Sequence, residues 1–255
     1  MERSFKKLTF FDKPSTFYSH ILLHQLFIMK NKFILLFFSS ALFFSLPACN
    51  SSGSGSREGK LYLRSTFFNG LSLSWIYLGN DGTIVQDPKN GADPVDINLE
   101  KQNNADNVGT YKMNDKKMEV TWQNGKTAEW SLEYDKEEIS AIDGGIVTLQ
   151  KGMPSGYMLD GQYAASAMLP NVGQIQTFVF KPNGTFTLNT MGVVRTEDAG
   201  STSEAKTKGT YSIKGNTMKI NFDNGQKIVG VITVFGDAAE KKFLVLNNSS
   251  FPQEK

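Results

Sequence analysis

Side chains able to perform acid–base or nucleophilic chemistry are sparse in this sequence. Both histidines, His20 and His24, precede residue 25, so the rest of the chain lacks the commonest general base and metal ligand. Ser203 and Lys206 fit the S-x-x-K spacing of serine nucleophiles, but they lie in a polar segment without the large α/β body which that motif requires. We treat the match as chance and assign no catalytic residue.

Two polar clusters have the residue types of a hydrolytic or a metal site. Asp135, Glu137 and Glu138 could supply the carboxylates of a glycosidase, but they directly follow a predicted strand, where a solvated turn is the simpler interpretation. The other cluster offers oxygen ligands for calcium without the spacing of an EF-hand: Asn103, Asn104, Asp106 and Asn107. We therefore expect neither a bound metal nor a cofactor.

The aromatic residues are better candidates for a site, because all three tryptophans lie between residues 75 and 130. Trp75 shares one face of an extended strand with Tyr77, and Trp122 and Trp130 lie on the inward faces of one predicted hairpin. One interpretation is a packed aromatic core, which a small β unit needs. The other is a ligand-lined interior or mouth, for which the candidate residues are Trp75, Tyr77, Trp122 and Trp130.

Cys49 is the only cysteine, and it lies between an apolar segment and a polar one. Before it, residues 29–48 begin with two lysines and continue with about fifteen apolar residues, too few to span a bilayer comfortably, which predicts a secretion signal. After it, residues 50–56 read NSSGSGS, a linker composition that cannot form a core around a thiol. Residues 1–28 exceed what a signal needs, and we expect an extension upstream of the true start.

The sequence Leu46-Pro47-Ala48-Cys49 resembles the lipobox of bacterial lipoproteins, with Pro47 where that family usually has a small residue. The resemblance implies that the Cys49 thiol is acylated and the bond before it is cut, so that residues 49–58 become a lipidated cysteine and a flexible tether. Asn50 is not the aspartate that retains many such proteins in the inner membrane. We expect an outer-membrane protein that faces the periplasm.

The part of the chain that follows the signal is close to neutral. Six basic and two acidic residues precede Cys49, so the 27 basic and 25 acidic residues of the whole chain become 21 and 23, a net charge of −2. A nucleic-acid partner requires a concentrated basic face, which this composition does not supply.

Beyond the tether the sequence repeats itself. GTYKMNDKKMEVTWQNG at 109–125 aligns without a gap with GTYSIKGNTMKINFDNG at 209–225, at a constant offset of one hundred residues. Upstream, GNDGTIV at 79–85 corresponds to KPNGTFT at 181–187. A repeat at this spacing predicts two structural units, which we place at residues 59–152 and at residues 157–250.

Each unit is predicted to be a series of short antiparallel strands. Apolar and polar residues alternate on both sides of Asn124-Gly125, the period of a hairpin whose tight turn needs positive φ angles. No segment has a convincing helical period, and the polar segments 87–107 and 194–206 are expected to be long loops. The expected strands are 60–68, 72–79, 82–86, 108–114, 117–123, 127–134, 145–150, 160–167, 175–181, 184–190, 207–214, 217–223, 227–235 and 242–247.

One expected strand departs from this alternation. Residues 227–237, KIVGVITVFGD, are apolar on both faces, which indicates a strand covered on both sides. We expect it to pack against the first unit near residues 151–157, where the two units join.

The repeated turn and core residues, G-T-Y followed by a hairpin at N-G, resemble the small lipocalin-like domains of secreted bacterial lipoproteins. The resemblance covers residues 60–150 loosely and 158–248 more closely, and the first copy departs from it at 115–117, where DKK replaces the GNT of the second. It implies an all-β fold of two tandem antiparallel lipocalin-like barrel or meander units. The shared motifs concern turns and core, so they supply no catalytic residues.

Together these features favour a membrane-anchored envelope lipoprotein that acts as a non-catalytic binding module for an apolar or carbohydrate small ligand. The alternative is a protein-protein interaction or structural module of the cell envelope, and an enzyme is the third hypothesis. The expected partners are the membrane, through the lipid on Cys49, and either a small ligand or an envelope protein.

The acylation hypothesis predicts the outcome of a single substitution. Cys49→Ser should abolish incorporation of radiolabelled palmitate, because the hydroxyl cannot form the thioether, and should release the protein or leave it unprocessed. Attached acyl chains contribute about 0.8 kcal/mol per buried methylene, and more than one chain makes the anchor stable. Continued labelling of the Cys49→Ser protein would contradict the assignment.

Overall fold

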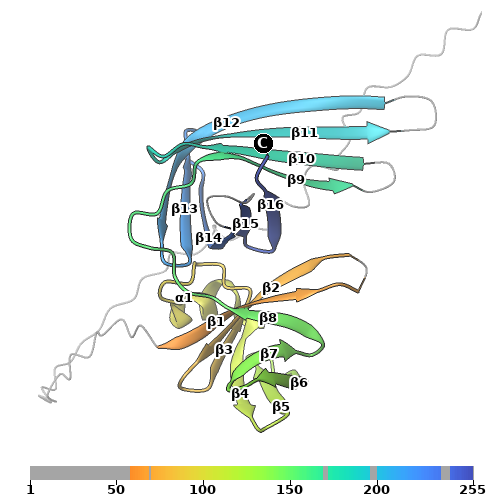
Figure 1. The fold of residues 1–255 in the computed structure, drawn as a ribbon, viewed down its shortest axis with the longest axis vertical. Coiled ribbons are helices and arrows are strands. Elements are labelled where there is room, and N and C mark those ends of the chain that lie inside the picture. Colours follow the sequence, from red (N-terminus) through yellow and green to blue (C-terminus); the bar gives the residue numbers. More distant parts are fainter. Residues whose placement is uncertain (1–57, 69, 169–171, 196–199, 237–241, 255) are drawn as a thin grey trace, which may run out of the picture. The chain divides into compact units, whose positions relative to one another are not determined.

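The computed structural model describes residues 58–254 except 69, 169–171, 196–199 and 237–241, so Cys49 and its flanking segments lie outside the described residues. Within them the chain is all-β and forms two eight-stranded antiparallel units in tandem (Figure 1), which confirms the predicted fold class. None of the helices in this part of the chain has the length and apolar character needed to cross a membrane.

The first unit is a closed barrel in which each strand pairs with the next and the last returns to the first, Tyr62 lying opposite Leu149. Its strands are β1 Gly59–Thr66, β2 Ser72–Gly79, β3 Thr83–Gln86, β4 Val108–Met113, β5 Lys117–Trp122, β6 Thr127–Asp135, β7 Glu138–Ile142 and β8 Gly145–Leu149. The interior is filled by buried side chains: Tyr62, Ile76, Leu78, Ile84, Met118, Val120, Leu132, Ile139, Ile142 and Val147.

The second unit is an eight-stranded sheet with the same sequential order. Its strands are β9 Gly161–Met168, β10 Val172–Phe180, β11 Thr185–Arg195, β12 Gly200–Lys214, β13 Thr217–Phe222, β14 Lys227–Phe235, β15 Phe243–Leu246 and β16 Ser249–Pro252. Its two outermost strands meet over a short distance, where Tyr163 bridges Gln253 and the Glu254 amide donates to the Gln162 carbonyl at 2.8 Å. The core is rich in aromatic rings, including the stacked pair Phe178 and Phe180.

The glycine of the shared Gly-Thr-Tyr sequence permits close strand contact in both units. A Cβ on Gly109 would lie 2.4 Å from the carbonyl oxygen of Thr121, and one on Gly209 would lie 2.0 Å from that of Asn221. Any side chain at either position would force the backbones apart. This glycine therefore serves the fold.

The tyrosine of the same sequence closes the preceding hairpin. The Tyr111 hydroxyl donates to the Gly79 carbonyl at 3.0 Å, and the Tyr211 hydroxyl lies 2.9 Å from the Lys181 carbonyl oxygen. Each of those carbonyls also accepts the amide that closes its own turn, from Gly82 and Gly184 respectively, so the ring stabilises turn and core together.

The turn at Asn124-Gly125 differs from the expected geometry. Only Gly125 has a positive φ, 81°, whereas the tight hairpin turn would require it at both residues. The Gly125 amide donates to the Trp122 carbonyl at 2.9 Å and the Trp122 amide to the Lys126 carbonyl at 2.8 Å, the pattern of a type I turn followed by a glycine bulge. The Asn124 side chain accepts the Lys126 amide at 3.0 Å, which explains the asparagine.

Part of the segment expected to be a long loop at 87–107 is helical. Helix α1 covers Ile97–Asn103 and a 3-10 turn covers Ala105–Asn107. The Asp96 side chain caps α1 by accepting the amides of Asn98 and Leu99 at 3.0 Å each. The capping aspartate was the available signal, but one short helical turn leaves little periodicity to detect.

The second expected loop, 194–206, is wrong for a different reason. Strand β11 continues to Arg195 and β12 starts at Gly200, so the two strands form a long hairpin. The side chains of 201–206 are exposed, and strands exposed on both faces show no apolar alternation. Ser203 and Lys206 accordingly lie on a strand.

Two further strands, β7 and β16, were not expected from the sequence. The pairing of β7 with β6 shifts register between Glu133 and Tyr134 of β6. On β7 both Ile139 and Ile142 are buried, which breaks the period of two. Strand β16 has only four residues and ends in Pro252. Irregular and very short strands give weak patterns.

Strand β14 is covered on both faces, as expected from its apolar sequence. Ile232 packs in the core of the second unit, while its neighbour Val231 packs with residues of β1 and β2, including Leu63 and Trp75. The expected contact of this strand with the first unit is therefore present. The Asn216 side-chain amide also donates to the carbonyls of Lys151 and Ile232, at 3.4 and 3.0 Å, which places the start of the 151–157 segment beside β14. The outer face of β14 is nevertheless covered by β1 and β2, whereas Met153 and Tyr157 pack on the core of the second unit.

The outer face of β1 and β2 and strands β14 and β15 thus form a third apolar cluster, which we call the shared core. It contains Leu61, Leu63, Leu73, Trp75, Tyr77, Val85, Val95, Ile97, Val108, Val231 and Val245. Hydrogen bonds reinforce it: the Trp75 indole N–H donates to the Asn247 carbonyl at 2.5 Å, and the Thr217 hydroxyl accepts the amides of Ala92 and Asp93 at 2.8 and 2.9 Å.

The shared core predicts a large effect for Trp75. Trp75→Ala should lower the free energy of unfolding by about 3–5 kcal/mol, because it removes a ring that is 1% exposed together with its hydrogen bond. Leu71→Ala, which alters a side chain 48% exposed just before the same strand, is the control and should cost less than about 1 kcal/mol. Urea denaturation of both variants measures the difference, and equal losses would contradict a stabilising shared core.

Candidate ligand-binding site

The four aromatic residues expected to form one site belong to two different places. Trp75 and Tyr77 are buried in the shared core, on the outer face of the first barrel. Trp122 and Trp130 pack on the barrel interior. The grouping of all four is therefore wrong: Trp75 stabilises the contact between units and presents no surface to a ligand. The signal was available, because β2, SLSWIYLG, is apolar on both faces like β14.

Trp122 and Trp130 come from neighbouring strands and form a pair. Their ring centroids lie 5.9 Å apart and their planes are tilted by 59°. Ala128, two residues before Trp130 on the same wall, has a small side chain that leaves room for the rings. Both tryptophans are half-buried, so part of each ring is accessible to solvent.

The polar edge of the pair is available for binding. Among the described residues, none accepts a hydrogen bond from the indole N–H of Trp122 or Trp130. No buried side-chain nitrogen or oxygen in this part of the chain lacks a hydrogen-bond partner. Both N–H groups must therefore reach solvent. They differ in this from the indole of Trp75, whose N–H is bonded to Asn247.

The second unit has no equivalent pair. Phe222 replaces Trp122 and packs edge-on against Phe186, at a centroid distance of 5.3 Å. Gly230 pairs with Met218 as Trp130 pairs with Met118. A Cβ at Gly230 would lie 2.6 Å from the Asn247 side chain, so no larger residue fits there.

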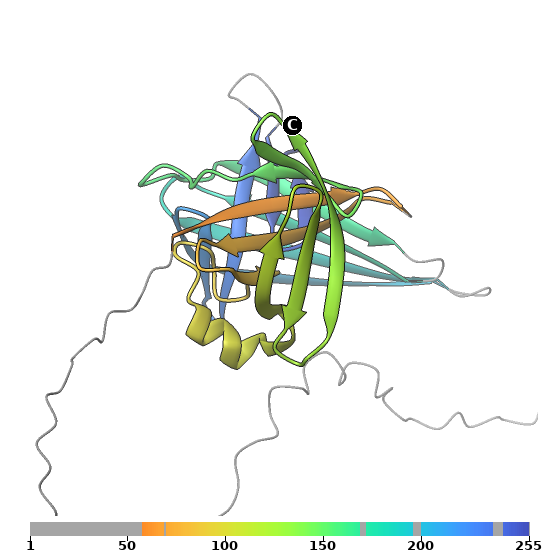
Figure 2. The same ribbon diagram turned by 90° about the horizontal axis from the view of Figure 1, so that it is seen from below.

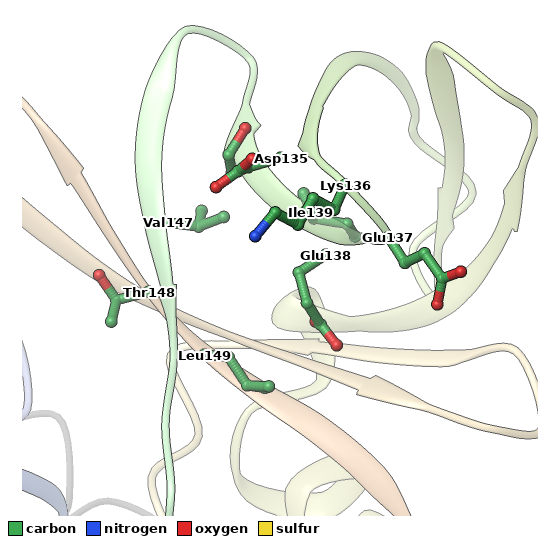
Figure 3. Close-up of a pocket in the computed structure, with 9 residues that line it drawn as sticks. Asp135, Lys136, Glu137, Glu138, Ile139, Val147, Thr148 and Leu149 are labelled. Atoms are coloured by element: carbon green, nitrogen blue, oxygen red, sulfur yellow. The ribbon is translucent and has the colours of Figure 1, made fainter.

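A hollow opens in the wall of the first barrel between β7 and β8. These strands pair only at Ala141–Ile146 and Ile142–Gly145, and the irregularity in β6–β7 pairing lies beside the gap. The hollow has a volume of about 730 Å³, and Figure 3 shows its walls. They consist of Asp135, Lys136, Glu137, Glu138, Ile139, Ser140, Val147, Thr148 and Leu149.

The hollow combines an apolar wall with a charged rim. Ile139, Val147 and Leu149 also pack on the barrel core. Glu138 forms an ion pair with Lys60 at 3.1 Å, both side chains being about half exposed, so the pair adds little stability. In Figure 3 the Lys136 amino group points across the hollow and Glu137 points away from it.

The carboxylates in this rim are those expected in a solvated turn. Asp135, Glu137 and Glu138 are exposed and surround the two-residue connection between β6 and β7. The hollow itself was not predicted, because it depends on β7 and on the incomplete pairing of β7 with β8.

Tyr62 lies behind the hollow, opposite Leu149 in the β1–β8 pair. Burial, and secondarily the negative charge of Glu138, raises the pKa of its hydroxyl to about 12. The side chain is 1% exposed. It remains a neutral hydrogen-bond donor at physiological pH.

The asparagine-rich segment that offers oxygen ligands without the spacing of an EF-hand surrounds a buried carboxylate. Glu100 is fully buried and accepts the amides of Lys89 and Asn90 at 2.9 and 2.7 Å, and the side-chain amides of Asn90 and Asn104 at 2.8 and 3.0 Å. Four donors compensate the buried charge and order the 87–107 segment. Over the described ranges, His, Cys, Asp and Glu side chains form no group of three that could hold a metal.

Fold and site together define an all-β protein of two tandem eight-stranded antiparallel units, with partly solvent-accessible aromatic and apolar surface in the first. Comparison with protein-family profiles, with curated proteins and with solved structures gives no match for this chain.

The raised pKa of Tyr62 predicts a loss of stability in alkali. The folded pKa of about 12 lies above the usual tyrosine pKa of about 10, so the folded state retains the proton more strongly. The stabilisation is complete below pH 10 and is lost as the pH rises from 10 to 12, by roughly 2–3 kcal/mol. Tyr163, whose pKa is also raised to about 12, contributes in the same window.

Tyr62→Phe removes the Tyr62 part of this dependence and leaves that of Tyr163. The slope of the unfolding free energy against pH between 10 and 12, measured by urea denaturation, should therefore fall in the variant. The fall should be less than half, because the pKa values of Tyr111, Tyr157 and Tyr211 are also raised by burial. An unchanged slope would show that Tyr62 ionises in the folded state as easily as in the unfolded state.

Proposed function

We propose that this chain is an outer-membrane lipoprotein, anchored through Cys49, whose first β unit binds a small carbohydrate or apolar ligand without chemically changing it. The observation that carries the proposal is the pair Trp122 and Trp130, half-buried on the barrel wall with both indole N–H groups turned to solvent.

The chemistry of the pair suits a carbohydrate better than a purely apolar molecule. An exposed indole face packs against the C–H face of a sugar ring, and the N–H donates to a hydroxyl at its edge. An alkyl chain would cover the rings and leave the two N–H groups without an acceptor, which costs free energy. A sugar has both a C–H face that packs on the indole rings and hydroxyl groups that accept from the two N–H groups.

The non-catalytic part of the proposal rests on the polar groups. The buried carboxylate Glu100 is held by four donors, and the exposed carboxylates of the β6–β7 turn face solvent. The first arrangement orders backbone and the second is a solvated turn, so both sets of carboxylates have a structural role. The anchor and the outer-membrane location rest on the sequence around Cys49.

A second candidate function, docking of an envelope protein, is favoured by the edge of β9. This strand is the last of its sheet, and beyond Tyr163 its outer side has no partner strand among the described residues. Residues 164–167, AASA, carry no charge and no proline to protect the edge. An extended peptide could add there as a further strand.

Tryptophan fluorescence tests the ligand site directly. In a Trp75→Phe background the remaining tryptophans are Trp122 and Trp130, so every change in emission reports on the pair. Titration with chito-oligosaccharides and maltodextrins, with medium-chain fatty acids as the apolar comparison, should shift or quench the emission saturably. Trp130→Ala should weaken binding roughly tenfold, the loss of about 1.4 kcal/mol of ring contact.

Trp130→Phe is the matched variant, because it keeps an aromatic ring in place and removes the N–H together with the five-membered ring. A carbohydrate should lose more affinity for this variant than a fatty acid does, since only the carbohydrate also loses a hydrogen bond. Emission that no ligand moves, with circular dichroism showing all variants folded, would contradict the ligand site and favour the docking function of β9.

A further inference from the structure

The tip of the β1–β2 hairpin presents an apolar surface that the ligand site does not use. Four side chains form it, which we call the tip patch: Phe67 at 68% exposed, Phe68 at 88%, Leu71 at 48% and Ile146 at 60%. Ile146 belongs to it because it lies opposite Ser65, the residue before the end of β1. Figures 1 and 2 both show this hairpin projecting beyond the other strands of its barrel.

The tip patch continues the outer apolar face of β1 and β2 beyond the shared core. Leu63 and Leu73 on that face are buried, at 4% and 7% exposed, whereas Leu71, two residues further toward the tip, is 48% exposed. No charged residue occurs between Arg64 and Asp81. The charges next to the patch, Arg64 and Asp143, form an ion pair at 3.6 Å, and the Arg64 guanidinium also donates to the carbonyls of Ile142 and Asp143. Transfer of Phe67, Phe68 and Leu71 into an apolar medium would therefore desolvate no unpaired charge.

We propose that the tip patch inserts into the surface of the same lipid bilayer that holds the anchor at Cys49, so that the chain contacts the membrane at two points. This inference rests on the proposed lipid anchor. A hairpin tip is suited to insertion because the strand pairing behind it satisfies the backbone groups.

The length of chain between the anchor and the barrel permits this second contact. Nine residues lie between Cys49 and Gly59, where β1 begins, and the ten Cα-to-Cα steps from one to the other can span at most about 35 Å. Strand β1, eight residues long, covers about 26 Å from Gly59 to the tip. The segment can therefore reach past the whole strand, and anchor and tip can lie in one membrane surface.

The size of the tip patch favours a bilayer over a second copy of the chain. Its four side chains expose roughly 500 Å², taking about 200 Å² for a fully exposed aromatic ring. A stable dimer buries about 800 Å² on each partner. Two phenylalanines at a projecting tip can instead enter the interfacial region of a bilayer and strengthen a lipid anchor.

Fluorescence quenching locates the tip. The full-length chain carrying Phe68→Trp is reconstituted on vesicles of phosphatidylethanolamine and phosphatidylglycerol with brominated acyl chains. Its additional emission should shift to shorter wavelength and be quenched relative to vesicles of unbrominated lipid. Met191→Trp, at an exposed apolar position on β11, is the matched control and should be neither shifted nor quenched. Unshifted, unquenched emission from Phe68→Trp would overturn the proposal.

Measurements of vesicle partition distinguish the contribution of the tip patch to membrane binding from that of the lipid anchor. In the Cys49→Ser chain, the double change Phe67→Ser and Phe68→Ser should lower the vesicle partition coefficient roughly tenfold or more, whereas Met191→Ser should leave it unchanged. Palmitate labelling of the parent chain tests the anchor independently, so a failed anchor and a failed tip give different results. Equal partition with and without the two phenylalanines would overturn the proposal, as would self-association in sedimentation equilibrium that these changes abolish.

Discussion

The structure depends on the burial of two strands, β2 and β14, each of which is apolar on both faces. Strand β2 sends Ile76 and Leu78 into the first barrel and Trp75 and Tyr77 to its outside, where water would contact them in an isolated barrel. Strand β14 has the same property, with Ile232 inside its own unit and Val231 outside. Each outer face covers the other, and the shared core stabilises the two units together because neither can bury all its apolar surface alone.

This constraint determines which aromatic residues remain for binding. The indole N–H of Trp75 is bonded to Asn247 and its ring is buried, so neither is available to a ligand. Trp122 and Trp130 lie on the inner wall, where the second unit does not reach them. The irregular β7 adds a hollow in the wall of the same barrel, with Tyr62 as a neutral donor behind it. The contact between the units and the proposed ligand site thus use opposite faces of the first unit.

The polar residues mainly organise backbone. Glu100 collects amides from the 87–107 segment, Thr217 accepts two amides from the other unit, and Tyr111 and Tyr211 close hairpin turns. A barrel whose buried polar groups are satisfied in this way is rigid, which suits a preformed binding surface. The same rigidity supports the projecting β1–β2 hairpin, whose apolar tip is then available to a membrane.

Local sequence determined much of this protein. Alternation around Asn124 and Asn224 predicted the all-β fold and the strand positions, because the period of two follows directly from strand geometry. The apolar run at 227–237 predicted a strand covered on both faces, and the offset of one hundred residues predicted two units. Local pattern failed at β7, where a bulge breaks the period, and along β11 and β12, where exposed strands resemble loops.

Only the tertiary structure decided which surfaces meet. The sequence places Trp75, Tyr77, Trp122 and Trp130 on strands of one unit, but strand alternation says only that a residue faces one side or the other. Which side is the barrel interior depends on how β1 closes on β8, and what covers the other side depends on β14 and β15. Both are contacts between residues far apart in the chain, and local periodicity contains no information about them.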